Sequence, residues 1–271
     1  MRVDGQLVEK PYKSSSKKIR RRQKKAGSML SAVQRLYDVC KDVFADGGAG
    51  VVPPHEDVER IRSVLDSLTP ADVGLSPNLP FFKKTEYKGP PAVRYLHLYD
   101  CPRFSIGIFC LPPTSCIPLH NHPGMTVFSK LLFGSMHIKS YDWVDVPENS
   151  NQPLKTGHFQ PPGMRLAKLH RDAVFTTPCE TSILYPLEGG NMHRFTAVTS
   201  CAVLDVLGPP YSDAEGRPCM YYNDFPYASF SGGADIVPGN GDEYAWLEEK
   251  AKPDDFFVLG AKYTGPKIIE R

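Results

Sequence analysis

The sequence predicts a mainly β protein, an antiparallel barrel or sandwich of the jelly-roll kind with a layer of two helices at its N-terminal side. From about Val93 onward, short runs rich in β-branched and aromatic residues alternate with turn residues. No alternation of strands with helices, as a parallel sheet would require, appears there. The 26 prolines and 22 glycines among the 271 residues fit frequent turns between short strands better than a helical bundle.

The N-terminal segment carries an uninterrupted basic run. Between positions 13 and 25 there are eight bases and no acid; without them, 24 of the 32 basic residues face 30 acidic ones, a net charge of −6. The rest of the chain therefore has no global attraction for nucleic acid, and no direct nucleic-acid contact is expected. Residues 1–27 are predicted to form a basic disordered tail, with a nuclear-localisation signal as the alternative reading.

Residues 28–271 are expected to form one domain. Ser28 is predicted to cap a first helix that ends at the Gly47-Gly48 pair, and apolar residues at helical spacing predict a second helix between Pro54 and Pro70, with His55 at its start. Asp145–Leu154, rich in Asn, Ser and Pro, is predicted to be an exposed loop. The predicted strand segments are Phe104–Cys110, Val127–Tyr141, Met164–Phe175, Ser182–Tyr185, Arg194–Thr199 and Ala202–Leu207.

The cysteines and the hydropathy pattern bear on the compartment. The seven cysteines are odd in number and lack CxxC spacing, which predicts free thiols in a reducing compartment. The sequence has neither a signal-peptide apolar region at its start nor a run of roughly 18 to 20 apolar residues. The expectation is a monomer in the nucleus and cytoplasm, away from membranes.

Three histidines form the candidate metal site. His120 and His122 stand at i and i+2, a spacing that puts both side chains on one face of a strand. His193, which follows a Pro and two glycines in YPLEGGNMHRF, is the best candidate for the third ligand. Imidazole suits zinc, copper, iron and nickel, so the three residues alone do not name the metal. The remaining histidines are predicted to be structural: His55, His97, His137, His158 and His170.

The two histidine segments resemble the paired motifs of the cupin superfamily, which implies a double-stranded β-helix. Gly134 stands where the first motif closes, but Val127 occupies the position of its Glu ligand. Three neutral imidazoles would leave Fe(II) with its full double positive charge, so the site should favour an anionic thiolate ligand. Three open positions would remain for sulfur, a neighbouring amine and O2, which fits oxidation of a thiol to its sulfinic acid.

Four longer segments resemble the plant cysteine oxidases, which are relatives of animal cysteamine dioxygenase. They are SIGIFCLPP, IPLHNHPGMTVFSKLLFGSMHIKSYDW, GGNMHRF and LDVLGPPY, which begin at Ser105, Ile117, Gly189 and Leu204. The resemblance implies an Fe(II) enzyme that uses O2 to convert the N-terminal cysteine of target proteins, such as group VII ethylene-response transcription factors, to cysteine sulfinic acid. The oxidised targets then enter the N-degron pathway, which ties the reaction to hypoxia sensing.

The same resemblance implies roles for individual residues. His120, His122 and His193 match the family's iron ligands, and Asp205 matches an acidic residue near the iron that is needed for activity. Tyr211 and Cys219 lie in a segment that the family places beside the substrate entrance. The animal relative can link a Cys to a Tyr at similar spacing through a thioether. A plain turn cysteine is the expectation for Cys219 beside Tyr221 here.

Three other functions stay open at this level. The first is oxidation of a small thiol, cysteamine or cysteine, instead of a protein N terminus. The second is a zinc or manganese cupin isomerase, which would turn over without O2. The third is a binding module whose basic tail contacts nucleic acid, in which case deletion of residues 1–27 would abolish function.

Overall fold

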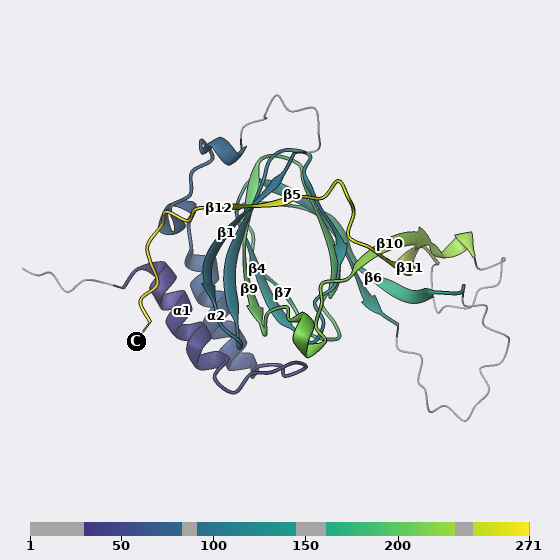
Figure 1. Ribbon diagram of the computed structural model, residues 1–271, viewed down its shortest axis with the longest axis horizontal. Coiled ribbons are helices and arrows are strands. Elements are labelled where there is room, and N and C mark those ends of the chain that lie inside the picture. The colour runs from purple at the N-terminus through teal and green to yellow at the C-terminus, as the bar shows by residue number, and fades with distance from the viewer. Residues whose placement is uncertain (1–29, 83–90, 145–160, 231–240, 271) are drawn as a thin grey trace, which may run out of the picture. The chain divides into compact units, whose positions relative to one another are not determined.

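The computed structural model describes residues 30–82, 91–144, 161–230 and 241–270 (Figure 1). The chain divides into two units, Met1–Leu30 and Ser31–Arg271, and the fold described here is that of the second. The predicted tail of residues 1–27, the Asp145–Leu154 loop and His158 lie outside the described residues. In the part of the chain that is described, no helix is long and apolar enough to cross a membrane.

Two α-helices precede the strands: α1 (Ala32–Val43) and α2 (His55–Ser67). The hydroxyl of Ser31 accepts a hydrogen bond from the backbone N–H of Gln34 (3.1 Å), so α1 is capped at Ser31 and the predicted start at Ser28 is wrong. The second helix begins at His55, as predicted. Short 3₁₀ turns occupy Pro70–Val73, Pro80–Phe82, Asp213–Glu215, Tyr227–Ser229 and Gly241–Glu243.

The strands form two sheets (Figure 1). The first has the order β12 (Val258–Ala261), β1 (Val93–Asp100), β2 (Ser105–Leu111), β9 (Cys201–Gly208), β4 (Thr126–Phe133), β7 (Ser182–Leu184). The second closes on itself in the order β10 (Tyr221–Pro226), β11 (Tyr244–Lys250), β6 (Met164–Thr176), β5 (Ser135–Trp143), β8 (Met192–Ala197), β3 (Cys116–His120). The predicted mainly β barrel with an N-terminal helical layer is confirmed.

Two details differ from the prediction. The single segment Val127–Tyr141 is two strands, β4 and β5, which separate at Gly134. Gly134 has φ +86°, and a Cβ there would lie 2.2 Å from the Ser200 carbonyl oxygen, so only glycine fits this turn. The expectation of purely antiparallel pairing is wrong at β12, which pairs with β1 in parallel.

Strand alternation decides which side chains face the site. On β2 and β9, Ile106, Leu204 and Val206 belong to the core shared with α1 and α2, whereas Gly107 and Asp205 line a cavity on the opposite face. Figure 1 shows both helices on the outer side of the first sheet. The helical layer thus fixes the first sheet from outside and leaves its inner face for chemistry.

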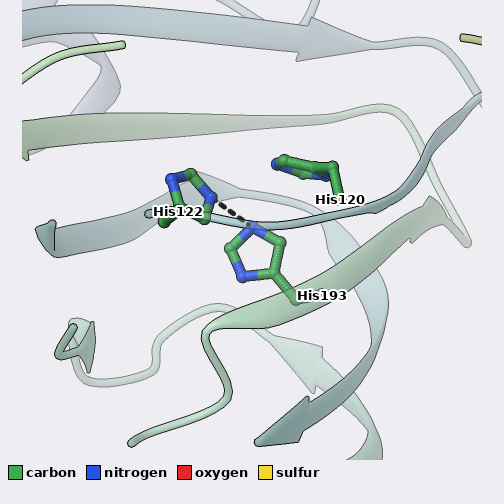
Figure 2. Close-up of side chains that lie close together, drawn as sticks. All are labelled: His120, His122 and His193. Atoms are coloured by element: carbon green, nitrogen blue, oxygen red, sulfur yellow. Dashed lines mark hydrogen bonds between the residues drawn. The ribbon is translucent and has the colours of Figure 1, made fainter. Parts of the chain in front are cut away.

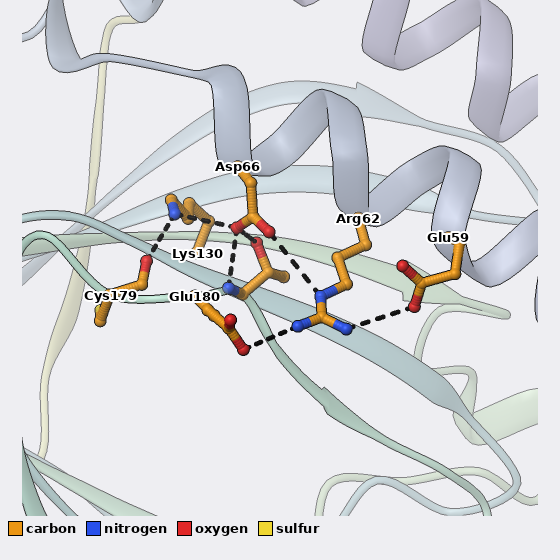
Figure 3. A network of polar contacts seen from close by, with 7 residues as sticks. Glu59, Arg62, Asp66, Lys130, Cys179 and Glu180 are labelled. Carbon is orange, nitrogen blue, oxygen red and sulfur yellow. Dashed lines mark hydrogen bonds and ion pairs between the residues drawn. The ribbon is translucent and has the colours of Figure 1, made fainter.

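A polar network ties α2 to this sheet (Figure 3). The Lys130 Nζ of β4, in a side chain only 10% exposed, donates to Asp66 Oδ1 (3.0 Å) and to the Cys179 carbonyl (2.7 Å). Asp66 Oδ1 also accepts from the backbone N–H (2.9 Å) and the hydroxyl (2.7 Å) of Thr181. Because the ammonium pairs with the Asp66 carboxylate and donates to the Cys179 carbonyl, its charge is compensated, and α2 is held against β4 and the segment before β7.

Candidate metal centre

The fold brings His120, His122 and His193 together in the barrel interior (Figure 2). His120 ends β3 and is the register partner of His193 on β8, whereas His122 lies two residues beyond the end of β3. The expectation that His120 and His122 share one strand is therefore wrong, but their rings still converge. The Nε2 atoms of His122 and His193 are 3.1 Å apart, and the candidate ligand atoms of all three lie within 4.8 Å of one another.

Burial keeps the three imidazoles neutral. All three residues are at most 7% exposed. Desolvation lowers the pKa of His120 to about 4 and moves the pKa values of His122 and His193 well below the ordinary value, and the neighbouring imidazoles lower those two further. The neutral form is the one that binds a metal ion, so the donor set fits a divalent transition metal without displacement of protons near pH 7.

Hydrogen bonds fix the tautomers of two of the rings. The Nδ1–H of His120 donates to the Pro118 carbonyl (2.8 Å). The Tyr211 hydroxyl donates to the Asn121 carbonyl (2.7 Å), which leaves its oxygen to accept from the Nδ1–H of His122 (3.0 Å). In both rings the Nε2 lone pair is thereby free for a metal, the arrangement found when an outer partner orients a ligating histidine.

One amide joins the two segments that carry the histidines. Asn191 is 6% exposed; its Oδ1 accepts from the His122 backbone N–H (3.1 Å) and its Nδ2 donates to the His122 carbonyl (2.8 Å). The same Nδ2 also reaches the carbonyls of Tyr185 (3.0 Å) and Pro186 (3.3 Å). Asn191 thus holds the His122 backbone against the turn that leads into His193.

The turn itself is held from β5. Both carboxylate oxygens of Asp142 accept from the Gly190 backbone N–H (2.9 Å each), and Oδ1 also accepts from that of Asn191 (2.9 Å). Gly190 has φ +85°, and a Cβ there would lie 2.5 Å from Ser140 Oγ. The predicted tight turn before His193 therefore depends on glycine at this position.

A cavity of about 470 Å³ opens onto the three rings. Asp205 lines it from β9: the residue is 6% exposed, and its Oδ1 has no hydrogen-bond partner among the described residues. Burial raises the pKa of Asp205 to about 7, and a hydrogen bond with Ser129 works in the opposite direction. A buried carboxyl group in the wall of a cavity that three imidazoles also line, with one oxygen that has no hydrogen-bond partner among the described residues, is typical of a binding site for a cationic or hydrogen-bond-donating group.

The family model PCO_ADO matches residues 64–268 of the chain. This chain belongs to the PCO_ADO family. Plant cysteine oxidase 2 of Arabidopsis thaliana is 55% identical over 260 residues, which cover 95% of this chain and 90% of the relative. Plant cysteine oxidase 1 of the same organism is 53% identical (88% and 81% covered), and the 2-aminoethanethiol dioxygenase of Mus musculus is 31% identical (89% and 98%).

This PCO_ADO chain is also similar, at lower sequence identity, to solved structures. A RmlC-like cupin protein from Desulfovibrio desulfuricans aligns with a TM-score of 0.29 and 17% identity, over 50% of this chain and 96% of its own.

The remaining predicted site residues of this PCO_ADO chain also line the cavity. Tyr211 and Cys219 lie on its wall together with Tyr221, and the Cys219 thiol hydrogen-bonds both tyrosine side chains. Desolvation raises the pKa of Cys219, so the thiol stays protonated near neutral pH. Tyr211, predicted beside the substrate entrance, orients His122 through its hydroxyl.

Sequence reasoning missed several residues of the site. Tyr95, His97, Asp100 and Ser105 also line the cavity; the first three lie outside every motif, and Ser105 begins the SIGIFCLPP segment but had no predicted role. Val127, which stands at the Glu position, is 1% exposed and packs with Met125 and Leu184. It lines a second cavity of about 450 Å³ that also reaches His193.

Proposed function

We propose that this chain is an iron-dependent thiol dioxygenase that oxidises the N-terminal cysteine of target proteins to cysteine sulfinic acid with O2. Membership of the PCO_ADO family and 53–55% identity to two plant cysteine oxidases support the thiol chemistry. The observation that carries the proposal is the donor set: three buried, neutral imidazoles converge, and the group found in the described residues includes no carboxylate.

The donor set accounts for a thiol substrate. His120, His122 and His193 would hold Fe(II), which supplies the redox chemistry that joins a coordinated thiolate to O2. Because the three imidazoles are neutral, they cancel none of the metal's charge, and an anionic thiolate is favoured over a neutral ligand. The reaction adds both atoms of O2 to one thiol sulfur, so no second reductant is needed.

Asp205 is the residue that we assign to the substrate amine. A thiol-bearing N-terminal cysteine places its ammonium two carbon atoms from sulfur. Asp205 lines the same cavity, and its Oδ1 has no hydrogen-bond partner among the described residues. An ammonium group beside this carboxyl would lower its raised pKa and stabilise the ionised pair. Asp205 therefore orients the amine, while Tyr211 keeps His122 in its metal-binding tautomer.

The wider biological role rests on the family relationship. We propose group VII ethylene-response transcription factors as the Cys-initiated protein substrates, and a place for the reaction in the N-degron pathway of hypoxia sensing. We further propose that the chain acts as a monomer in the nucleus and cytoplasm, with residues 1–27 as a basic tail outside the domain formed by residues 28–271.

The test is a substrate assay on purified, iron-loaded protein. A Cys-initiated peptide incubated in air is expected to gain two oxygen atoms by mass, whereas a peptide that starts with Ser should not change. Oxidation of free cysteamine alone would favour the small-thiol alternative. Turnover that persists without O2 would point to the isomerase alternative, and both outcomes would contradict the proposal.

A further inference from the structure

The cavity extends well beyond the metal site. Its outer part is formed by the inner faces of β1 and β2, which we call the β1–β2 wall: Tyr95, His97, Asp100, Ser105 and Gly107. At about 3.3 Å per strand residue, the wall runs about 16 Å from Tyr95 to Asp100, the length of four to five extended residues. A volume of about 470 Å³ lies in the range of about 300–1,000 Å³ that holds a drug-sized ligand, far larger than one cysteine.

The part of the wall beside Asp205 is built around Gly107, which is also the register partner of His97 on β1. Gly107 is the register partner of Asp205, and a Cβ at this position would lie 2.4 Å from the ring and hydroxyl of Tyr95. The glycine therefore lets the Tyr95 ring lie flat on β2, beside Asp205. The ring also packs against Phe109, with centroids 5.0 Å apart. Burial and the carboxylates of Asp205 and Asp100 raise the pKa of Tyr95 to about 12, so its hydroxyl is a donor at neutral pH.

The outer end of the wall is polar and accessible. His97 and Asp100 are exposed, and the hydroxyl of Ser105 lies on the same cavity surface. Together with Tyr95, they offer the mixture of donors and acceptors that a peptide backbone requires. His97 has no predicted functional role, but the structure places it in the cavity wall on β1, two residues from Tyr95.

The charge of the cavity selects among thiols. None of the described residues that line it is Lys or Arg, and two of them, Asp100 and Asp205, are acidic. Lys252 is outside this lining, although its Nζ lies 5.5 Å from the centroid of the Phe256 ring. A free cysteine would bring its carboxylate into this acidic surface, where none of the described lining residues is a Lys or Arg that could pair with it. A cysteine whose carboxyl is a peptide bond avoids that cost.

From these observations we infer that the β1–β2 wall is a binding subsite for the first residues after the N-terminal cysteine of the substrate, and that it favours neutral or basic residues over acidic ones. The inference rests on the proposed function, since the peptide occupies a groove continuous with the metal site. Asp205 holds the amine beside Gly107, and Tyr95 and His97 bind the following peptide groups.

Four thiols test the subsite on iron-loaded protein: free cysteine, cysteinamide, and two Cys-initiated pentapeptide amides that differ by Lys or Glu at the third position. We expect a KM about tenfold lower for the Lys peptide than for cysteinamide, equivalent to about 1.4 kcal/mol. Free cysteine should be poorer than cysteinamide. The Glu peptide should have a KM about threefold above that of the Lys peptide, a gap that Asp100→Asn should close.

The variants Tyr95→Phe and His97→Ala should each raise the KM of the Lys peptide about three- to tenfold more than they raise the KM of cysteinamide. Gly107→Ala, which displaces the Tyr95 ring, should act in the same direction. His137→Ala is the matched control, because this exposed histidine pairs with Asp172 and does not line the cavity. Calorimetric titration of metal-free protein with a Ser-initiated pentapeptide gives a readout that does not depend on turnover.

Equal KM values for cysteinamide and the Lys pentapeptide would contradict the subsite but not the proposed function. Equal losses for both thiols in the variants would also overturn it, because they would indicate a structural role. If no thiol is oxidised, the proposed function fails. Binding of the Ser peptide that is weakened by Tyr95→Phe but not by His137→Ala would then still support the subsite.

Discussion

Replacement of Asn191 tests whether a residue outside the ligand set determines metal affinity. Its side chain makes four hydrogen bonds of 2.8–3.3 Å, two of them to the His122 backbone. At about 1 kcal/mol each, with buried partners left unsatisfied, Asn191→Ala should lower the free energy of unfolding by about 3–5 kcal/mol. Release of the His122 segment should also weaken metal binding about 10- to 100-fold, as loss of an outer hydrogen-bond partner does elsewhere.

The assay is an anaerobic Fe(II) titration against a chromophoric chelator, at a temperature where circular dichroism shows the variant to be folded. Asn191→Asp keeps the acceptor for the His122 N–H but turns the donor into an oxygen that faces carbonyls, so it should be as harmful as alanine. Asn223→Ala is the matched control, because the Asn223 side chain hydrogen-bonds Glu248 and Lys250 of β11. Wild-type iron affinity in a folded Asn191→Ala variant would refute the reasoning.

Three further substitutions probe the site. The pKa of Asp205 in the folded protein is raised from 3.8 to about 7, so Asp205 destabilises the fold increasingly as pH rises between these values. Asp205→Asn should therefore raise the free energy of unfolding of metal-free protein at pH 8 by a few kcal/mol, measured by urea unfolding. The same substitution should lower the activity. Tyr211→Phe removes the acceptor for His122 Nδ1–H and should weaken iron binding about tenfold by chelator competition. Gly190→Ala forces a φ of +85° on alanine and a contact with Ser140, and should destabilise the fold by about 2–4 kcal/mol. Each expectation has a result that would contradict it. For Gly190→Ala it is an unchanged unfolding curve, and for Tyr211→Phe it is unchanged iron binding. For Asp205→Asn it is a stability difference from wild type that does not depend on pH.

The barrel, the helical layer and the three histidines could be predicted from the sequence, because each depends on local spacing. Period-2 alternation marks β2 and β9, and the Gly189-Gly190 pair marks the turn before His193. Gly134 could have indicated a turn within Val127–Tyr141. Strand-like sequence on both sides of it led to the prediction of one strand in place of β4 and β5. The parallel pairing of β12 with β1 joins segments far apart in the chain, and no local pattern encodes such a pairing.

The outer part of the site could not be predicted for a related reason. Tyr95 and His97 gain a role only because β1 lies beside β2 and because Gly107 leaves room for the Tyr95 ring. A lone histidine on a strand is more often structural than functional, so His97 was assigned no function. Asn191 and Asp142 likewise act through backbone contacts, which single-sequence patterns do not indicate.

Isotope labelling tests the central claim most directly. Iron-loaded protein is mixed with a Cys-initiated peptide under ¹⁸O2 in unlabelled water, and the product is analysed by mass spectrometry. We expect a sulfinic acid that carries two ¹⁸O atoms, formed by wild-type protein and lost in His193→Ala together with bound iron. An unoxidised peptide, or a product whose oxygen comes from water, would contradict it.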